Sequence, residues 1–171
     1  MIGMPNSKLL TIAVPAYNAA SYLHTCLDSL VQSGDEVEVL VVNDGSKDGT
    51  LQVARDYAER YPGIVVAVDQ ENRNWGGAVN HALELASGTF FYIVDSDDWL
   101  DSAKLTEVVS RLRMLEEQQA GVDLYMVNYV YNRVENGDRH TISYEKLLPS
   151  GKVVGWDAMS NPSLDQYIMI H

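Results

Sequence analysis

Hydrophobic positions in this chain form short apolar runs that alternate with stretches of helical period. Four runs have the length and β-branched content of strands, at 9–14, 37–42, 64–68 and 90–94. After each run, apolar residues recur every three or four positions, which predicts helices at about 22–32, 50–61, 76–86 and 102–119. Consecutive βα units predict an α/β fold, in which a mostly parallel, Rossmann-like sheet carries helices on both faces.

The helical stretches also predict caps and buried faces. Ser21 is a suitable N-cap for the first helix, whose apolar face would carry Leu23, Cys26, Leu27, Leu30 and Val31. In the third helix, the period places three apolar side chains toward the sheet, namely Val79, Leu83 and Ala86.

Beyond Gly121 the pattern becomes alternating and rich in Tyr and Val. The segments 123–134 and 139–144, joined by an Asn-Gly-Asp turn, predict a C-terminal β-hairpin. We therefore expect a single domain over 1–171, with a βα core at about 9–120. Residues 121–171 would hold the hairpin and the start of a further region, in a chain that we expect to be truncated.

The net charge and the amino-acid composition argue against some classes of function. The net charge of −12 argues against a nucleic-acid surface, which needs clustered Lys and Arg, but not against a phosphorylated small molecule. The single cysteine, Cys26, cannot form an internal disulfide and indicates a reducing compartment. No stretch has the length of a transmembrane segment. The Tyr-rich hairpin, from Tyr125 to Tyr131, is a surface that an absent segment or a second copy, in a homo-oligomer, could cover.

The fourth apolar run ends abruptly in carboxylates, at Asp95, Asp97 and Asp98. An uninterrupted apolar run predicts a strand buried on both faces, so these acids would lie just past its carboxyl end. Ligands of open α/β sheets bind in the crevice at that end, and carboxylate oxygens suit Mg²⁺ or Mn²⁺. The structural alternative is that acids here only cap the next helix, through Asp97, Asp98, Asp101 and Ser102.

The first two strands also end in side chains that suit a nucleotide. After the first strand, Tyr17 could stack on a nucleobase while Asn18 braces the loop, or the pair could be a packed Tyr and an Asx-turn. Asp44 ends the second strand and could accept hydrogen bonds from a ribose or a base, or serve the turn alone. The segment from Asp44 imitates a calcium loop, but Arg55 stands where that loop needs a Glu. The following helix would be capped by Asp48 or Ser46.

The paired glycines Gly76 and Gly77 follow the third strand, at the predicted start of a helix. Glycines there let a ligand approach backbone N–H groups at the positive end of the helix dipole. The segment is not the GxGxxG of a dinucleotide fold, which argues against a nicotinamide enzyme. Each of the four segments has a structural explanation, but all four lie where a parallel strand ends, which favours one shared site.

These motifs resemble those of the family 2 glycosyltransferases, which have the GT-A fold. The resemblance covers 9–101 and is carried by four ordered segments, at 11–18, 41–50, 76–80 and 95–99. It implies that this chain is the N-terminal, donor-binding portion of an enzyme that transfers a sugar, with inversion, from a nucleotide-sugar that is usually UDP-linked. The acceptor would be a saccharide or a lipid-linked hydroxyl in surface polysaccharide synthesis. The enzyme would then work in the cytoplasm, at the inner face of the membrane.

The resemblance also implies roles for residues. Asp97, with Asp95, would hold Mn²⁺ or Mg²⁺ in the place of the family's DxD motif. The donor nucleotide would contact Pro15, Ala16, Tyr17, Asn18, Asp44, Gly76, Gly77, Asn80, Asp95 and Ser96.

Two features depart from the family pattern. Trp75 precedes the glycines without an assigned role, and no residue fits the catalytic base. Asp157 and Asp165 are available but lack a recognisable motif, so we expect the base beyond His171. A non-catalytic nucleotide-sugar-binding module is the alternative function. A nucleotidyltransferase would need a basic, glycine-rich loop after the first strand, where the chain has Pro15-Ala16-Tyr17-Asn18 instead.

Overall fold

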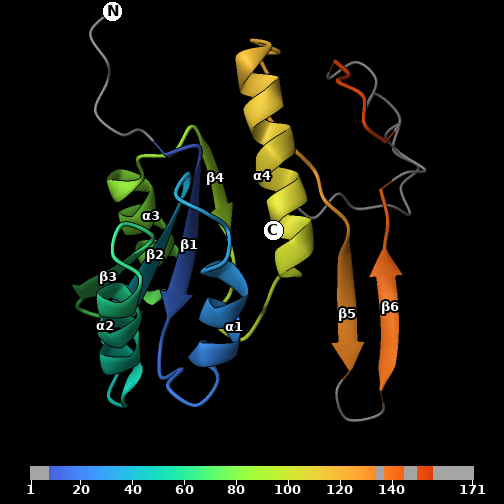
Figure 1. The fold of residues 1–171 in the computed structure, drawn as a ribbon. Coiled ribbons are helices and arrows are strands. Elements are labelled where there is room, and N and C mark those ends of the chain that lie inside the picture. Colours follow the sequence, from blue (N-terminus) through green and yellow to red (C-terminus); the bar gives the residue numbers. More distant parts are fainter. Residues whose placement is uncertain (1–7, 134–136, 145–149, 156–171) are drawn as a thin grey trace, which may run out of the picture. The chain divides into compact units, whose positions relative to one another are not determined.

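The computed structural model describes residues 8–133, 137–144 and 150–155. Four parallel strands form one sheet in the order β3-β2-β1-β4 (Figure 1). The strands are β1 (Leu10–Ala16), β2 (Val37–Asp44), β3 (Val65–Gln70) and β4 (Phe90–Ile93). The predicted parallel α/β sheet is confirmed. The chain divides into two compact units between Met114 and Leu115.

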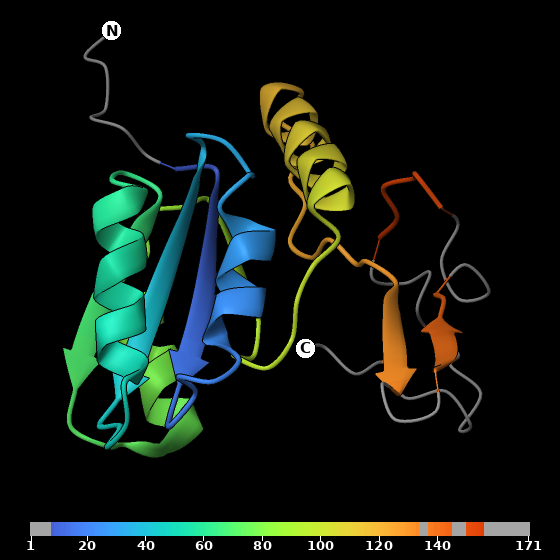
Figure 2. The same ribbon diagram turned by 60° about the horizontal axis from the view of Figure 1, so that its bottom comes forward.

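Four helices connect and follow the strands. They are α1 (Leu23–Leu30), α2 (Thr50–Arg60), α3 (Asn74–Leu85) and α4 (Ser102–Glu117). Helices α1 and α2 cover one face of the sheet and α3 covers the other (Figures 1 and 2). The Tyr57 hydroxyl joins α2 to α1 by donating to the Asp28 carboxylate, 2.6 Å away. The prediction that helices cover both faces of the sheet is confirmed.

The core under α3 is built from small and β-branched side chains. Two alanines of the helix, Ala78 and Ala82, have no exposed surface, and they let the helix axis come close to the sheet. They pack against side chains of β1, β2 and β3, namely Ala13, Leu40, Val42 and Val68, with Phe91 and Ile93 of β4 beside them. Burial of these apolar surfaces fixes how α3, and so the loop before it, sits on the sheet.

The prediction that the fourth strand is buried on both faces is wrong. Residues 90–93 are all half-buried, because β4 is an edge strand that pairs with β1 alone within the described residues. The inward position predicted for Leu83 is also wrong. Its side chain is 56% exposed, because the face of α3 that packs on the sheet carries Ala78 and Ala82, four residues apart.

The entry into α1 differs from the prediction as well. Tyr22 takes the N-cap position without a side-chain hydrogen bond, so Ser21 is not the cap. The loop before the helix is instead fastened to α2, since Ala19 N–H donates to Thr50 Oγ1 at 2.7 Å and Ala20 N–H to Asp48 Oδ2 at 3.1 Å. The apolar face of α1 is as predicted, and all five of its side chains are buried.

A buried carboxylate ties the sheet together near the amino ends of its central strands. Glu38 of β2 is only 9% exposed, and its Oε1 accepts hydrogen bonds from Thr11 Oγ1 and Ser87 N–H, both at 2.6 Å. Gly88 N–H donates in turn to Thr11 Oγ1 at 2.9 Å. A buried acceptor with paired donors stabilises the turn that leads into β4.

The second unit contains the predicted hairpin. Strands β5 (Tyr129–Arg133) and β6 (Asp138–Ile142) pair antiparallel, and Gly137 has a φ of +71° in the turn. The first strand begins at Tyr129, six residues later than expected. The Tyr129 and Tyr131 rings pack edge to face, 5.3 Å apart, while about half of Tyr131 remains exposed. Asn136 and residues 156–171 lie outside the described residues.

Candidate functional site

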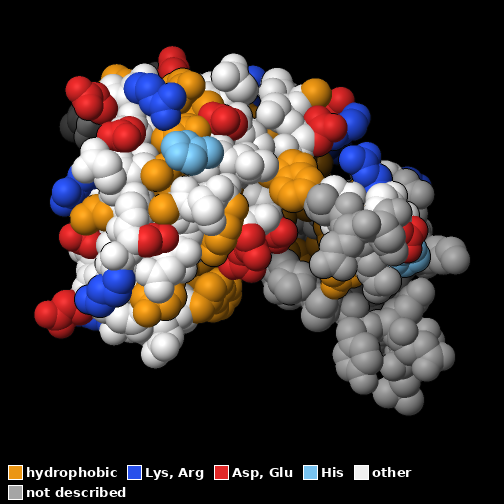
Figure 3. Space-filling model, turned by 90° about the horizontal axis from the view of Figure 1, so that it is seen from below, with side chains coloured by type: hydrophobic (Ala, Val, Ile, Leu, Met, Phe, Trp, Pro, Cys, Tyr) orange, Lys and Arg blue, Asp and Glu red, His pale blue; other side chains and the backbone are white. Residues whose placement is uncertain are grey.

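The candidate site lies at the edge of the sheet where the parallel strands end. Because β1, β2, β3 and β4 run in one direction, the segments that follow them share this edge. Figure 3 looks onto it from below Figure 1 and shows acidic and large hydrophobic side chains side by side. The acids after β2 and β4 therefore lie at the same edge of the molecule.

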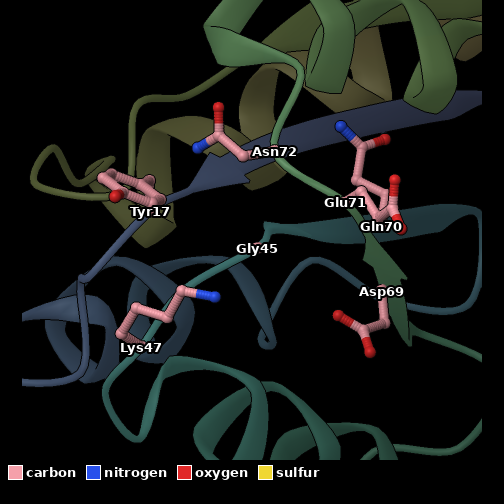
Figure 4. Close-up of a pocket in the computed structure, with 7 residues that line it drawn as sticks. All are labelled: Tyr17, Gly45, Lys47, Asp69, Gln70, Glu71 and Asn72. Atoms are coloured by element: carbon pink, nitrogen blue, oxygen red, sulfur yellow. The ribbon is translucent and has the colours of Figure 1, made fainter.

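A pocket of about 430 Å³ opens at this edge, and the loops after three of the strands line it. The Lys47 ammonium and the Asp69 carboxylate project into it from opposite sides (Figure 4). Its full lining is Tyr17, Gly45, Lys47, Asp69, Gln70, Glu71 and Asn72. A concave site of this size, with one aromatic ring and several polar groups, suits a flat polar ligand.

Tyr17 projects from the end of β1 because Asn18 anchors the loop. Asn18 has a φ of +50°, its Oδ1 accepts Lys47 N–H at 2.8 Å, and its own N–H donates to Ser46 Oγ at 3.0 Å. The Tyr17 side chain is 51% exposed, so it is not packed in the core. The preceding pair, Pro15 and Ala16, is buried at the end of the strand.

Asp44 fastens the loop after β3 to the end of β2. Its side chain is 3% exposed, and Oδ1 accepts hydrogen bonds from Gln70 Nε2 and Arg73 N–H, both at 2.7 Å. Asn72 Nδ2 donates to its backbone carbonyl at 2.9 Å. Asp44 therefore shapes the wall of the pocket, and its contact with a ribose or base stays a prediction.

Asp48 caps the start of α2 from one residue outside the N-cap, in agreement with one of the two predicted candidates. Its Oδ1 accepts from Thr50 N–H and Oγ1, at 3.0 and 2.5 Å. These hydrogen bonds hold the pKa of the exposed Asp48 carboxyl below its ordinary value. Asp48 thus serves the loop and the helix.

Gly45 permits the close approach of the loops after β2 and β3. Its φ is +68°, and a Cβ placed on it would lie 2.7 Å from the Asn72 backbone nitrogen. We expect Gly45→Ala to lower the free energy of unfolding by about 2 kcal/mol, measured by urea denaturation. Gly34→Ala is the control, because Gly34 has a φ of +88° and open space around it. Equal losses in the two variants would contradict a specific role for the loop contact.

The acid segment after β4 forms a tight turn beside α1 and α3. Asp98 N–H donates to the Asp95 carbonyl at 2.9 Å, and Ser96 is buried while Asp97 is exposed. The Cys26 thiol of α1 lies 3.8 Å from the same carbonyl. Burial, and then the charges of Asp98, Asp97 and Asp95, raise the pKa of that thiol to about 12. The contact between the Cys26 thiol and the Asp95 carbonyl places the acid segment against α1.

The alternative interpretation, that these acids cap the following helix, is confirmed for Asp101. Its Oδ1 accepts Lys104 N–H, in the first turn of α4, at 3.0 Å. Ser102 Oγ donates instead to the Ser29 carbonyl, which joins α4 to α1. Across the described part of the chain, no cluster of three or more His, Cys, Asp or Glu side chains could hold a metal.

The paired glycines lie in the first turn of α3, which begins earlier than predicted. A Cβ on Gly76 would meet nothing within 4 Å, whereas a Cβ on Gly77 would lie 2.3 Å from Arg73 Cβ. Gly77 is therefore needed by the helix entry itself, and only Gly76 leaves open space beside the backbone. Asn80 is exposed on α3 and does not line the pocket.

Sequence reasoning missed Lys47, the segment 69–72 and the contact between Trp75 and Asp95. Trp75 Nε1 donates to Asp95 Oδ1 at 2.7 Å, across twenty residues of sequence. The segment 69–72 could have been recognised from the sequence, since it is a polar run at the end of a predicted strand, like the segments that follow the first, second and fourth strands. No local sequence pattern predicts the contact between Trp75 and Asp95, because it depends on how α3 packs on the sheet.

A sequence profile of the family described as Glycosyl transferase family 2 matches residues 11–162. The chain belongs to this family. EpsH of Bacillus subtilis (strain 168), which is named as a glycosyltransferase, is 31% identical over 170 residues, covering 91% of the chain and 47% of EpsH. The chain thus spans about half the length of this relative. The GT-A fold predicted from the motifs is confirmed.

Two solved structures with bound nucleotide-sugars resemble this family 2 domain. TarS of S. aureus, residues 1–349 in complex with UDP-GlcNAc, matches with a TM-score of 0.56 and 31% identity over 63% of the chain and 32% of TarS. The mannosyltransferase PcManGT of Pyrobaculum calidifontis, in complex with GDP-Man and Mn²⁺, matches with a TM-score of 0.53 and 30% identity. That match covers 61% of the chain and 32% of PcManGT.

Proposed function

We propose that this chain binds the nucleotide-sugar donor of an inverting glycosyltransferase, with a UDP-sugar as the donor. One observation carries the proposal, namely that a pocket with an exposed Tyr17 ring shares the carboxyl edge of the sheet with Asp95 and Asp97. A nucleoside diphosphate needs a flat surface for its base and a positive partner for its phosphates. The TarS complex with UDP-GlcNAc supports the choice of UDP.

In this proposal the pocket receives the base and the ribose. The Tyr17 ring offers a stacking face. The exposed Asp69 carboxylate, whose Oδ1 accepts from Asn43 Nδ2, offers its other oxygen as an acceptor to the polar edge of a pyrimidine. The Lys47 ammonium group projects into the same space, where it would place a positive charge near the phosphates. Asp44 contributes by holding the pocket wall, through its bonds to Gln70 and Arg73.

The residues after β4 fit a divalent cation. Asp97 is exposed, and one oxygen of the half-buried Asp95 is already taken by Trp75, which leaves Oδ2 for a ligand. Mg²⁺ is commonly held by one or two carboxylates, with substrate phosphates and water completing its shell. Asp97, with Asp95, would hold Mn²⁺ or Mg²⁺. When bound, the ion neutralises the negative charge that develops on the departing nucleoside diphosphate. The PcManGT complex with Mn²⁺ supports this choice.

The acceptor half of the reaction is proposed from the family alone. The acceptor would be a saccharide or lipid-linked hydroxyl, and a carboxylate would remove its proton. Asp157 and Asp165 lie outside the described residues. A buried, unpaired Cys26 is consistent with a cytoplasmic enzyme. Among the described helices, none combines the length and the apolar character that crossing a bilayer requires.

A thermal-shift panel tests this proposal, because a ligand that binds the native state raises the apparent stability. We expect UDP and UDP-sugars with Mn²⁺, at about 100 times their Kd, to raise the Tm by roughly 5–10 °C. GDP and GDP-mannose serve as the comparison for base selectivity. No shift with any nucleotide, with or without Mn²⁺, would contradict donor binding. A shift without sugar transfer would favour a binding module.

A further inference from the structure

The contact between Trp75 and Asp95 joins two elements that the donor site brings together. Trp75 is the second residue of α3, and Asp95 lies just beyond β4. The indole N–H donates to Asp95 Oδ1 at 2.7 Å. A hydrogen bond to a carboxylate at this length is of the strong, charge-assisted kind.

Hydrogen bonds of the segment before Trp75 fix the backbone position from which the indole projects. Asn74 has a φ of +62°, and its N–H donates to Asn72 Oδ1 at 3.2 Å. Asn72 Nδ2 donates to the Asp44 carbonyl at 2.9 Å. The short segment 72–75 is thus tied at one end to the tip of β2 and at the other to the residue that follows β4. It connects the pocket wall to the acid segment.

Packing alone does not explain Trp75. Its side chain is 54% exposed, so it buries little apolar surface for a residue of its size. Its hydrogen bond to Asp95 is made to a carboxylate of the proposed donor site. With Oδ1 held by the indole, the Asp95 side chain cannot rotate freely, and Oδ2 keeps one direction. A carboxylate that is oriented before the ligand arrives loses less conformational entropy on binding.

We propose that Trp75 is a positioning residue, whose indole N–H orients the Asp95 carboxylate toward a metal-bound nucleoside diphosphate. The inference rests on the proposed function, since it needs a nucleotide and a cation at this edge. It goes beyond that function by assigning a role to a side chain outside the donor and metal residues. It predicts that loss of the N–H weakens metal-dependent binding more than metal-free binding.

Two substitutions separate the N–H from the ring. Trp75→Phe keeps an aromatic ring and removes the donor, whereas Trp75→Gln removes the ring and keeps an N–H at the same number of bonds from Cβ. Leu83→Ala is the matched control, because Leu83 is also on α3 and is 56% exposed. Both Trp75 variants are expected to fold with a Tm close to that of the unmodified chain, since the side chain is mostly exposed.

The readout is the Kd of UDP by calorimetry, measured once with saturating Mn²⁺ and once with EDTA. We expect Trp75→Phe to weaken binding about tenfold in Mn²⁺ and less than about twofold in EDTA. Trp75→Gln should retain most of the affinity in Mn²⁺, and Leu83→Ala should match the unmodified chain.

Each contrary outcome has a distinct meaning. If the unmodified chain binds UDP with Mn²⁺ and Trp75→Phe binds equally well, the positioning role is overturned and donor binding stands. Equal weakening of Trp75→Phe in Mn²⁺ and in EDTA would also overturn it, because the ring would then act on the nucleotide directly. If the unmodified chain binds no UDP, the proposed function fails and the inference fails with it.

Discussion

Replacing Asp97 with Ala is expected to weaken UDP binding at saturating Mn²⁺ by roughly 100-fold, which corresponds to about 2.7 kcal/mol. Asp97 is exposed beside the half-buried Asp95, and the two would supply the protein's carboxylate ligands for the cation. Loss of one of two carboxylates removes a charge that the metal–diphosphate complex needs. Calorimetric titration of UDP into the variant, with Mn²⁺ and with EDTA, measures the effect.

The matched control for Asp97 is Asp101→Ala. Asp101 is also an exposed carboxylate of this segment, but it accepts the Lys104 N–H at the start of α4. The control should lose about 1 kcal/mol of stability as a capping residue and should keep its affinity for UDP and Mn²⁺. Unchanged binding in Asp97→Ala, or an equal loss in Asp101→Ala, would contradict the assigned role of Asp97.

The second large effect is on stability, where Glu38→Ala is expected to lower the free energy of unfolding by about 3 kcal/mol. The carboxylate is buried and accepts from Thr11 Oγ1 and Ser87 N–H, both at 2.6 Å. Its removal leaves the buried Thr11 hydroxyl and the Ser87 N–H without their acceptor and opens a cavity between β1 and β2. Urea denaturation should show a lower midpoint with an unchanged slope.

Glu38→Gln is the informative control, because an amide oxygen can accept both hydrogen bonds without a charge. It should lose less than half as much stability as Glu38→Ala. A second control, Glu59→Ala, removes an exposed carboxylate of α2 and should change stability by less than about 0.5 kcal/mol. Equal stability of Glu38→Ala and the unmodified chain would show that this network does not hold the strands.

The central strands could be predicted from the sequence because burial dictates their composition. The runs at 9–14 and 37–42 agree with β1 and β2 to within two residues at each end. The edge position of β4 could not be predicted, since its apolar residues match those of a central strand and the pairing order is a long-range property. The inward position of Leu83 was predicted wrongly for a related reason, because the packing of Ala78 and Ala82 against the strands decides which face of α3 is buried.

For the site, the sequence predicted the shared edge but not the contacts within it. A parallel sheet brings strand ends together whatever the loops do, so the motifs after the strands converge. Lys47 and Asn72 enter the pocket because Gly45 lets two loops approach, which no local pattern records. The Trp75 bond to Asp95 depends on the packing of α3 and the left-handed backbone of Asn74.

The most direct test of the central claim is a crystal structure of the chain with UDP and Mn²⁺, with the anomalous signal used to locate manganese. We predict a manganese peak within about 2.5 Å of an Asp97 oxygen. The uracil should lie in the pocket against the Tyr17 ring. A manganese peak remote from Asp97, or a nucleotide bound away from the edge where the strands end, would contradict the account.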